Sequence, residues 1–427
     1  MQGFEWHVPA DQLHWKRLQK ALPSLRDIGV DRMWIPPGCK GMDASGIGYD
    51  VYDLWDLGEF HQKGSRATRW GPKEHLSEMM QTAQDVGIGI CWDTILNHKA
   101  GADRTETFQA TKVNPEDRNA AISPPENISG WVRFDFSGRK GKYSSMKYHH
   151  QHFNGVDWNE TRKETAIYKI AGARKDWAKD VSDEHGNYDY LMFANLDHTN
   201  PEVRADIFKW SEWIGTELPI SGMRIDAAKH YSAAFQRDFV NHLRRTTFVG
   251  NHDTQPGQSL ETIIIPFFKP IAYGLILLRS QGQPCVFYGD LYGLRGGPAS
   301  LSRPACSGKL PILMQARKLY AYGEQRDYFD KRHCIGFVRY GTVHYSWGLA
   351  CVISNTVATY KRMYVGVKHM GEEWTDILDW CIETVIIDHR GYGIFPVAAK
   401  SISVWVNDKA KGRKSLARPF DTDIYDL

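Results

Sequence analysis

Three short groups of polar residues carry the side chains that could do chemistry. They are the segments 93–98 (DTILNH), 222–230 (GMRIDAAKH) and 251–253 (NHD). In the second group, Arg224 and Asp226 stand two positions apart on a predicted strand, so both side chains point to one face. A guanidinium beside a carboxylate lowers the carboxylate pKa and keeps the group ionised. An ionised carboxylate suits a nucleophile, although an Arg–Asp pair at a strand end can also be purely structural.

Each group follows a short apolar strand in a region where strands and helices alternate. The strand candidates are 31–37, 88–98, 220–227, 247–253 and 283–290. Helical stretches separate several of them, and in one such stretch, 71–87, the apolar residues recur at helical spacing. This alternation predicts a parallel sheet. Polar residues at the carboxyl ends of the strands are typical of the active site of an α/β barrel.

The alternation is interrupted once and then stops. Residues 99–195 are rich in Gly, His, Asn, Asp and aromatic residues and have no long helical period, which predicts an inserted β domain. The barrel would then occupy residues 1–98 and 196–320. Short strands separated by turn signals at 321–406 predict a C-terminal antiparallel β-sandwich. The polar and charged residues 407–427 predict a loose tail.

Charge and hydropathy exclude some classes of partner. The chain of 427 residues has 53 basic and 50 acidic residues and a formal net charge of +3, which gives no reason to expect nucleic acid or an anionic membrane. Its longest apolar run, 271–278, is far shorter than the ~20 residues of a membrane span. No signal-peptide pattern opens the sequence, so as written we expect a cytoplasmic monomer, or a secreted protein if the N-terminus is incomplete.

Together the three polar groups resemble, in order and residue type, the signature segments of the α-amylase family of glycoside hydrolases. The segments 46–64, 186–197, 248–261 and 362–377 are also similar to that family, and most of all to bacterial liquefying amylases and their fungal intracellular relatives. The resemblance implies a TIM-type (β/α) barrel with an inserted β domain and a C-terminal β-sandwich. It also implies cleavage of internal α-1,4 bonds in starch- or glycogen-type glucans by a retaining mechanism with two carboxylates.

The resemblance further implies a role for each matching residue. Asp226 would be the nucleophile that forms the covalent glycosyl-enzyme, and Asp253 would hold and distort the sugar at the cleavage point. Arg224 would keep Asp226 charged, with Asp93 as its structural partner. The other implied substrate contacts are Tyr49, which would stack on the sugar, His98 and His252, which would hydrogen-bond it, and Lys229 and His230, which would meet the leaving-group side.

A calcium site between the barrel and the inserted domain is implied as well. Its ligands would be Asn97, Asp157, Asp189 and the backbone carbonyl of His230. Two positions depart from the pattern of the close relatives, because Ala178 and Asn195 stand where those proteins carry Asp. Calcium prefers six to eight oxygen ligands. Fewer anionic ligands therefore predict a weakened site, or one that has lost its metal.

The segment that should supply the general acid is too short. In this family the acid is a Glu at the end of the fifth barrel strand, between the Arg-x-Asp and Asn-His-Asp segments. Only 27 positions separate Asp226 from Asp253 here, and they hold one helix, one strand and no Glu. A barrel uses roughly 30 residues for each of its eight units, so about two units are absent, leaving about six, with a seam near 245–247. No other Glu offers a convincing replacement.

Two consequences follow from this gap. The chain is expected to be a poor amylase, because general acid catalysis contributes about 10²–10⁴-fold. The barrel must either close with six strands or stay open, with unpaired edges that invite aggregation. Two other functions remain open: a non-catalytic glucan-binding or regulatory relative that keeps Tyr49, His98, Asp226 and His252 as sugar contacts, and a transglycosylase of the same family.

Overall fold

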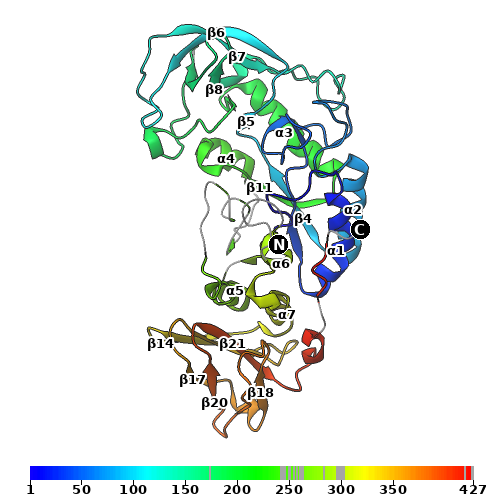
Figure 1. Cartoon of the computed structure of the whole chain (residues 1–427), viewed down its shortest axis with the longest axis vertical. Helices are drawn as coiled ribbons and strands as arrows, with labels where there is room; N and C mark the ends of the chain where they lie inside the picture. Colours follow the sequence, from blue (N-terminus) through cyan, green and yellow to red (C-terminus); the bar gives the residue numbers. More distant parts are fainter. Residues whose placement is uncertain are drawn as a thin grey trace.

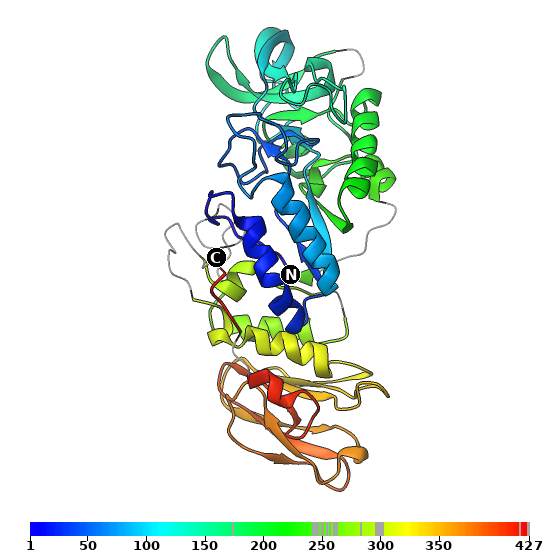
Figure 2. The same cartoon turned by 90° about the vertical axis from the view of Figure 1, so that its right-hand side faces the viewer.

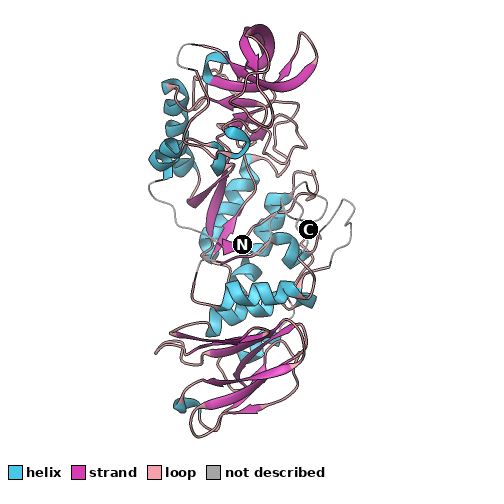
Figure 3. Cartoon of the chain, turned by 90° about the vertical axis from the view of Figure 1, so that its left-hand side faces the viewer, coloured by secondary structure: helices cyan, strands magenta, loops and turns pink. Residues whose placement is uncertain are grey.

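The computed structural model describes residues 1–172, 175–240, 247–248, 252, 255, 258, 264–281, 284–294, 303–417 and 420–424. The molecule is elongated, with a β domain at each end and most of the helices between them (Figure 1 and Figure 3). The predicted catalytic residue Asp253 lies outside the described residues. So does most of the predicted seam at 245–247, of which only the backbone of Thr247 is described.

Parallel strands run through the middle of the molecule. The strand β4 (Gly89–Thr94) lies between β1 (Arg32–Trp34) and β11 (Ile220–Ile225) and pairs with both in parallel. Gln2 forms a parallel bridge with Trp34, and its backbone N–H donates to the carbonyl of Val286 at 2.6 Å.

A second pair of parallel strands continues the arc beyond the N-terminal segment. Val286 follows β13 (Pro284–Cys285), which pairs in parallel with β12 (Thr247–Phe248). Six segments thus form one arc that runs from β12, through β13, the N-terminus, β1 and β4, to β11. In the described part of the chain β11 and β12 do not pair with each other, so the arc is open between them.

Helices cover the outer face of this arc. The helices α1 (His14–Asp27) and α2 (Lys73–Val86) lie side by side (Figure 2). The helix α2 buries Leu76, Met79, Met80 and Ala83, which are the residues whose spacing predicted it. It ends at Gly87, whose φ of 75° is the left-handed conformation that glycine adopts at little cost. The remaining helices are α3 (Pro201–Glu217), α4 (Ala233–Val240), α5 (Phe268–Leu278), α6 (Tyr288–Tyr292) and α7 (Leu310–Tyr320).

An antiparallel sheet of six strands forms one end of the molecule. Its order is β5–β10–β8–β9–β6–β7. The bounds are β5 (His98–Lys99), β6 (Arg104–Lys112), β7 (Glu126–Arg133), β8 (Phe153–Asn159), β9 (Glu164–Ile170) and β10 (Ala194–Leu196). Its strands lie between His98 and Leu196, whereas the sequence predicts the inserted domain at 99–195. A short hairpin of β2 (Lys40–Gly41) and β3 (Val51–Asp53) precedes it in the chain.

Two antiparallel layers form the other end. The larger has the order β14–β15–β16–β21–β18–β19 and the smaller pairs β17 with β20. The bounds are β14 (Gln325–Lys331), β15 (Cys334–Arg339), β16 (Leu349–Ser354), β17 (Thr359–Tyr364), β18 (Glu373–Asp376), β19 (Val385–Ile386), β20 (Tyr392–Val397) and β21 (Ser401–Asn407). Val352 and Trp405 from one layer and Met363 and Phe395 from the other share a buried core. This is the two-layer arrangement that the short strands predicted.

The C-terminal segment differs from the loose tail expected at 407–427. Residues Arg413–Ala417 form a 3₁₀ helix, and the side chains of Leu416 and Ile424 are buried. These apolar side chains join the main core, and burying them offsets the entropy of ordering a polar segment. The exact domain boundaries stay a prediction. None of the helices that the structure describes is long and apolar enough to cross a membrane.

Candidate active site

The register of the central sheet places the first two polar groups side by side. Arg224 on β11 lies opposite Asp93 on β4. Its Nη1 donates to Oδ1 of Asp93 at 2.9 Å and to Oδ1 of Asp226 at 2.6 Å. The backbone N–H of Asp226 donates to the carbonyl of Thr94 at 3.0 Å, which holds the start of the turn after β11. One guanidinium therefore joins two carboxylates at the carboxyl ends of neighbouring strands.

Asp93 is the more deeply buried of the two carboxylates. Besides Arg224, it accepts hydrogen bonds at Oδ2 from the hydroxyl of Tyr49 at 2.7 Å and from Nε1 of Trp34 at 2.9 Å. Burial raises the pKa of Asp93 to about 6, and the positive charge of Arg224 opposes that rise. Burial alone would lower the pKa of Arg224, but the neighbouring Asp93, Tyr49 and Asp226 outweigh it and raise the pKa above its ordinary value.

Three rings form a near-parallel group beside this ion pair. Tyr49 stacks on His252 with ring centroids 5.1 Å apart and planes 9° from parallel. Trp6 lies 6.3 Å from Tyr49 and 6.0 Å from His252, with its plane within 10° of both. His252 is buried, and the side-chain amide of Gln2 donates to its Nδ1 at 2.9 Å. Burial lowers the pKa of His252 to about 3, so the ring is neutral.

Three further residues of this site, Gln2, Trp6 and Trp34, are not predicted by the sequence motifs. A signal for two of them is present in the sequence: Gln2 and Trp6 stand at even spacing, with Phe4 between them, in the first barrel segment. Even spacing places side chains on one face of an extended segment. Trp34 carries no comparable signal, because an indole N–H within an apolar strand has the same pattern as an ordinary core residue.

The other predicted substrate contacts are His98, Lys229 and His230, and they lie in different surroundings. His98 is buried, and its Nε2 is 2.8 Å from the carbonyl of Tyr49, while its Nδ1 is buried with no hydrogen-bond partner. Lys229 is exposed and pairs with Glu184 at 2.7 Å. Nδ1 of His230 lies 2.6 Å from the carbonyl of Tyr188. Lys229 and His230 thus contact the segment that ends the inserted domain rather than Asp226.

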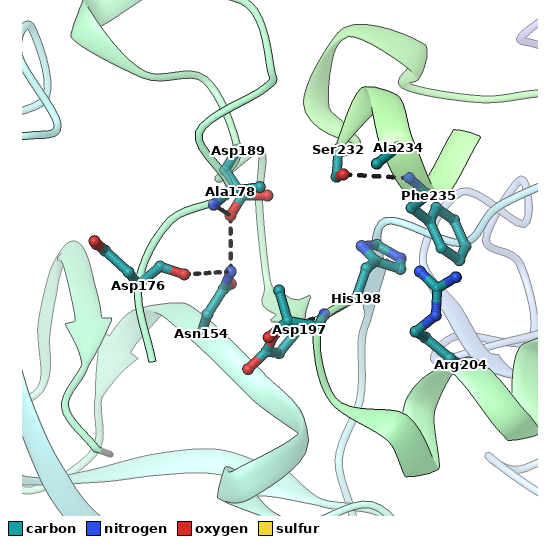
Figure 4. A pocket seen from close by; sticks show the side chains of 11 residues that line it. Asn154, Asp176, Ala178, Asp189, Asp197, His198, Arg204, Ser232, Ala234 and Phe235 are labelled. Atoms are coloured by element: carbon teal, nitrogen blue, oxygen red, sulfur yellow. Dashed lines mark hydrogen bonds between the residues drawn. The ribbon is translucent and has the colours of Figure 1, made fainter. Parts of the chain in front are cut away.

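Two of the predicted calcium ligands belong to a network of side-chain amides. Nδ2 of Asn97 donates to Oδ1 of Asn195 at 3.0 Å, and Nδ2 of Asn195 donates to Oδ1 of Asn154 at 2.8 Å. Nδ2 of Asn154 in turn donates to Oδ2 of Asp189 at 2.7 Å, and the backbone N–H of Ala178 donates to the same oxygen at 2.8 Å (Figure 4).

This network leaves one acceptor unused. Oδ1 of Asn97 is buried and has no hydrogen-bond partner. Asp189 carries the single carboxylate of the chain of amides, and burial raises its pKa to about 7. Asn154, Ala178 and Asp189 also line a cavity of about 270 Å³. A buried oxygen without a partner, linked through Asn195 to a buried carboxylate, fits a cation, although an asparagine at 195 lets the amides satisfy one another.

The other two predicted ligands are Asp157 and the backbone carbonyl of His230. Oδ2 of Asp157 accepts from the backbone N–H of Phe193 at 2.8 Å. His230 lies against Tyr188, with ring centroids 4.2 Å apart. Within the described ranges, no three side chains of His, Cys, Asp or Glu are grouped closely enough to hold a metal ion by themselves.

Comparisons with known proteins agree with this arrangement. The family "Alpha amylase, catalytic domain" matches residues 14–241, and "Alpha-amylase C-terminal" matches residues 349–406. An α-amylase of Bacillus licheniformis is 40% identical over 477 aligned positions, covering 95% of this chain and 93% of that protein. A cytoplasmic α-amylase of Escherichia coli strain K12 is 32% identical, covering 95% of this chain and 98% of that protein.

A solved structure shows the same fold at lower identity. The α-amylase of Geobacillus thermoleovorans, complexed with acarbose, superposes with a TM-score of 0.57 at 13% identity. The match covers 95% of this chain and 96% of that one. The parallel arc described above is therefore part of a TIM-type barrel, with a C-terminal β domain beyond it.

Proposed function

Because the chain belongs to the α-amylase family of glycoside hydrolases, we propose that it binds α-1,4-linked glucans of the starch and glycogen type beside Asp226. The observation that carries this proposal is the pairing of Arg224 with both Asp93 and Asp226 at the carboxyl ends of β4 and β11. A carboxylate that attacks a sugar must be ionised, and an arginine 2.6 Å away favours that state.

The proposed chemistry is that of a retaining glycosidase. Asp226 would attack the anomeric carbon and form a covalent glycosyl-enzyme as the bond to the leaving oxygen breaks. Asp253, which lies outside the described residues, would hold the sugar in its distorted form. The step also needs an acid that protonates the leaving oxygen, and the 27 positions between Asp226 and Asp253 contain no Glu.

We propose that this chain is therefore an impaired member of its family. Three observations support the absence of about two βα units. The match to the catalytic-domain family ends at residue 241, next to the predicted seam. The alignment with the B. licheniformis protein spans 477 positions, but 95% of 427 residues is only about 406, so roughly 70 aligned positions have no residue here. In addition, β11 and β12 do not pair in the described part of the chain.

Two alternatives keep the same site. A non-catalytic glucan-binding relative would use Tyr49, His98 and His252 as sugar contacts without an acid. The stacking of Tyr49 on His252 limits the sugar contacts of this alternative, because the ring face of Tyr49 that lies against His252 is not available to a sugar. A transglycosylase would pass the glycosyl group from Asp226 to a second sugar, and it needs the same missing acid.

An assay on soluble starch with purified protein tests the proposal. We expect turnover at least about 10²–10⁴-fold below that of the B. licheniformis enzyme assayed beside it, because general acid catalysis is lost. Maltoheptaose should still bind in calorimetry. Asp226→Asn is the control, since residual turnover that survives this change comes from a contaminant.

Each outcome separates the alternatives. Turnover close to that of the intact relative would contradict the impairment. Binding without turnover supports a glucan-binding protein. Products longer than maltoheptaose, formed when maltoheptaose is the substrate, support a transglycosylase. Absence of both binding and turnover would contradict the glucan site itself.

We further propose a weak calcium site at Asn97, Asp157, Asp189 and the carbonyl of His230. The free Oδ1 of Asn97 and the buried carboxyl group of Asp189 support it. Bound calcium would neutralise Asp189 and join the inserted domain to the barrel. Only hard oxygen ligands are offered there, as calcium requires.

We also infer a monomer that acts in the cytoplasm, without nucleic acid or membrane as partner. The cytoplasmic α-amylase of E. coli supports the location. Secretion remains the alternative if a leader precedes the sequence. The near balance of 53 basic and 50 acidic residues supports the absence of a nucleic-acid partner.

A further inference from the structure

Trp34, at the end of β1, contacts three members of the predicted active site. Its indole Nε1 donates to Oδ2 of Asp93 at 2.9 Å. The guanidinium carbon of Arg224 lies 4.8 Å from the centre of its ring. The ring of His252 meets it edge to face, with the two centroids 5.5 Å apart. Trp34 is only partly buried, so its ring is more than a part of the closed core.

The carboxylate of Asp93 depends on a small number of donors. Its side chain is fully buried, out of reach of bulk water. Three described groups donate to it, namely Nη1 of Arg224, the hydroxyl of Tyr49 and Nε1 of Trp34. Burial favours the neutral acid, whereas hydrogen bonds to the ionised form favour the carboxylate. Because the pKa of Asp93 is about 6, the loss of one donor is enough to bring its titration to neutral pH.

Two charged groups face Asp93 within the described ranges. They are Arg224 and Asp226, both from β11 and the turn after it. Burial keeps the other titratable groups of this neighbourhood neutral, because it raises the pKa of a phenol or a thiol and lowers the pKa of an imidazole. These neutral groups are Tyr49, Tyr231, Cys39 and His252.

The three charges sum to one negative charge while Asp93 is ionised. Arg224 joins both carboxylates but balances only one of them. A proton on Asp93 would bring the sum to zero. The transition state of glycosyl transfer is an oxocarbenium-like cation, which a net negative charge in a buried site stabilises.

We propose that Trp34 is a positioning residue that keeps Asp93 ionised and so preserves the net negative charge beside Asp226. The indole suits this task because its N–H is a donor only and does not titrate in the physiological range. Attraction between its ring face and the guanidinium of Arg224 holds the two side chains together. This role rests on the proposed function, since the charge would stabilise the sugar that Asp226 attacks.

Two probes of equal size measure this charge without requiring turnover. Maltosyl isofagomine is a trisaccharide analogue with an ammonium group at the anomeric position, and maltotriose is its neutral counterpart. In calorimetry on the full chain, the ratio of the two affinities gives the preference of the site for a cation. We expect the wild-type protein to prefer the cationic probe, and this preference should fall with a midpoint of about pH 6 as Asp93 takes up a proton.

Trp34→Phe removes the N–H and keeps an aromatic ring. It should raise the midpoint by about one to two pH units, because a hydrogen bond to the charged form is lost. At pH 7 the preference for the cationic probe should therefore fall about two- to tenfold, while the affinity for maltotriose stays unchanged. The two proteins should agree at pH 5, where Asp93 is protonated in both.

Trp70→Phe is the matched control. Trp70 is buried, and its Nε1 donates to a neutral acceptor, the carbonyl of Pro37, at 3.0 Å. This change should leave the preference and its midpoint unaltered. Asp93→Asn removes the charge itself, so it should show the low preference at every pH, and Trp34→Phe added to it should lower the preference no further.

Thermal melting curves at each pH establish that the variants are folded. The role of Trp34 is overturned if the midpoint of Trp34→Phe equals that of the wild type, if Trp70→Phe moves it as far, or if Trp34→Phe weakens both probes equally at all pH values. A wild-type protein that binds maltotriose without preferring the cation would also overturn it, and would leave the glucan site intact. Binding of neither probe would contradict the glucan site and this role together.

Discussion

Asp189 shows at the scale of one residue how a buried carboxylate links stability to pH. Burial raises its pKa from 3.8 to about 7, although Ala178, Asn154 and Asn195 donate to it. Between these two pH values the unfolded chain releases the proton while the folded chain keeps it. The folded state therefore binds more protons than the unfolded state, and stability falls as the pH rises from about 4 to 7.

Replacing this carboxylate is expected to stabilise the protein at alkaline pH. In EDTA at pH 8, Asp189→Asn should raise the free energy of unfolding by at most about 4 kcal/mol, because each unit of pKa shift corresponds to about 1.4 kcal/mol. The gain should vanish towards pH 4, where the wild-type carboxyl group is protonated in both states. Urea denaturation followed by tryptophan fluorescence measures both values.

Calcium should make the wild-type protein more stable than Asp189→Asn at pH 8. Addition of calcium at pH 8 should stabilise the wild-type protein and leave Asp189→Asn unchanged. The matched control is Asp176→Asn, whose carboxylate is largely exposed and pairs with Lys169. A variant at Asp189 that is less stable than the wild type at pH 8 in EDTA would contradict the raised pKa.

At the scale of elements, the helix α3 and the strand that follows it position the predicted nucleophile. The side chain of Asn200 accepts from the backbone N–H groups of Glu202 at 2.8 Å and Val203 at 3.4 Å, and Pro201 occupies the first helical position. Both features are typical of a helix start. The helix packs Trp210 and Ile214 into the core and leads directly to β11, which ends at Ile225, next to Asp226.

Loss of this cap should therefore destabilise the segment that carries Arg224. Asn200→Ala is expected to lower the free energy of unfolding by about 1 kcal/mol, because two N–H groups lose their acceptor. Asn200→Asp should keep most of the stability, since its carboxylate also accepts from these groups and suits the positive helix end. Guanidinium denaturation compares the variants, and equal losses in both would show that the cap contributes nothing.

At the scale of the whole molecule, close packing of α5 on β21 joins the barrel to the C-terminal domain. Gly274 on α5 faces Ile402 on β21, which is fully buried. A Cβ atom at position 274 would lie 2.1 Å from Cδ1 of Ile402, far inside van der Waals contact. The two domains can approach this closely only because position 274 has no side chain.

Gly274→Ala is expected to lower the free energy of unfolding by about 1–3 kcal/mol through overpacking. The higher helix propensity of alanine should offset up to about 1 kcal/mol of this loss. Ile402→Val removes the methyl group that the new Cβ meets. The double variant Gly274→Ala/Ile402→Val should be more stable than the sum of the two single changes predicts. Additive losses in chemical denaturation would contradict a direct contact.

The sequence predicted much of the fold because its signals are local. The apolar residues of 71–87 recur at helical spacing, and α2 spans Lys73–Val86. The short apolar segments at 31–37, 88–98 and 220–227 contain β1, β4 and β11. The polar composition of 407–427 predicts a loose tail, yet Leu416 and Ile424, which are single apolar residues in this stretch, are buried. Isolated residues of this kind have no period that would predict their burial.

The sequence alone determined the types and order of the groups that could do chemistry, and the absence of a Glu between Asp226 and Asp253. Only the tertiary structure decided which of these groups meet. Arg224 joins Asp93 to Asp226 across two strands 131 residues apart in the chain, and Trp6 stacks with Tyr49 and His252. Such contacts depend on strand register and on the packing of distant segments, which leave no pattern in any one stretch of sequence.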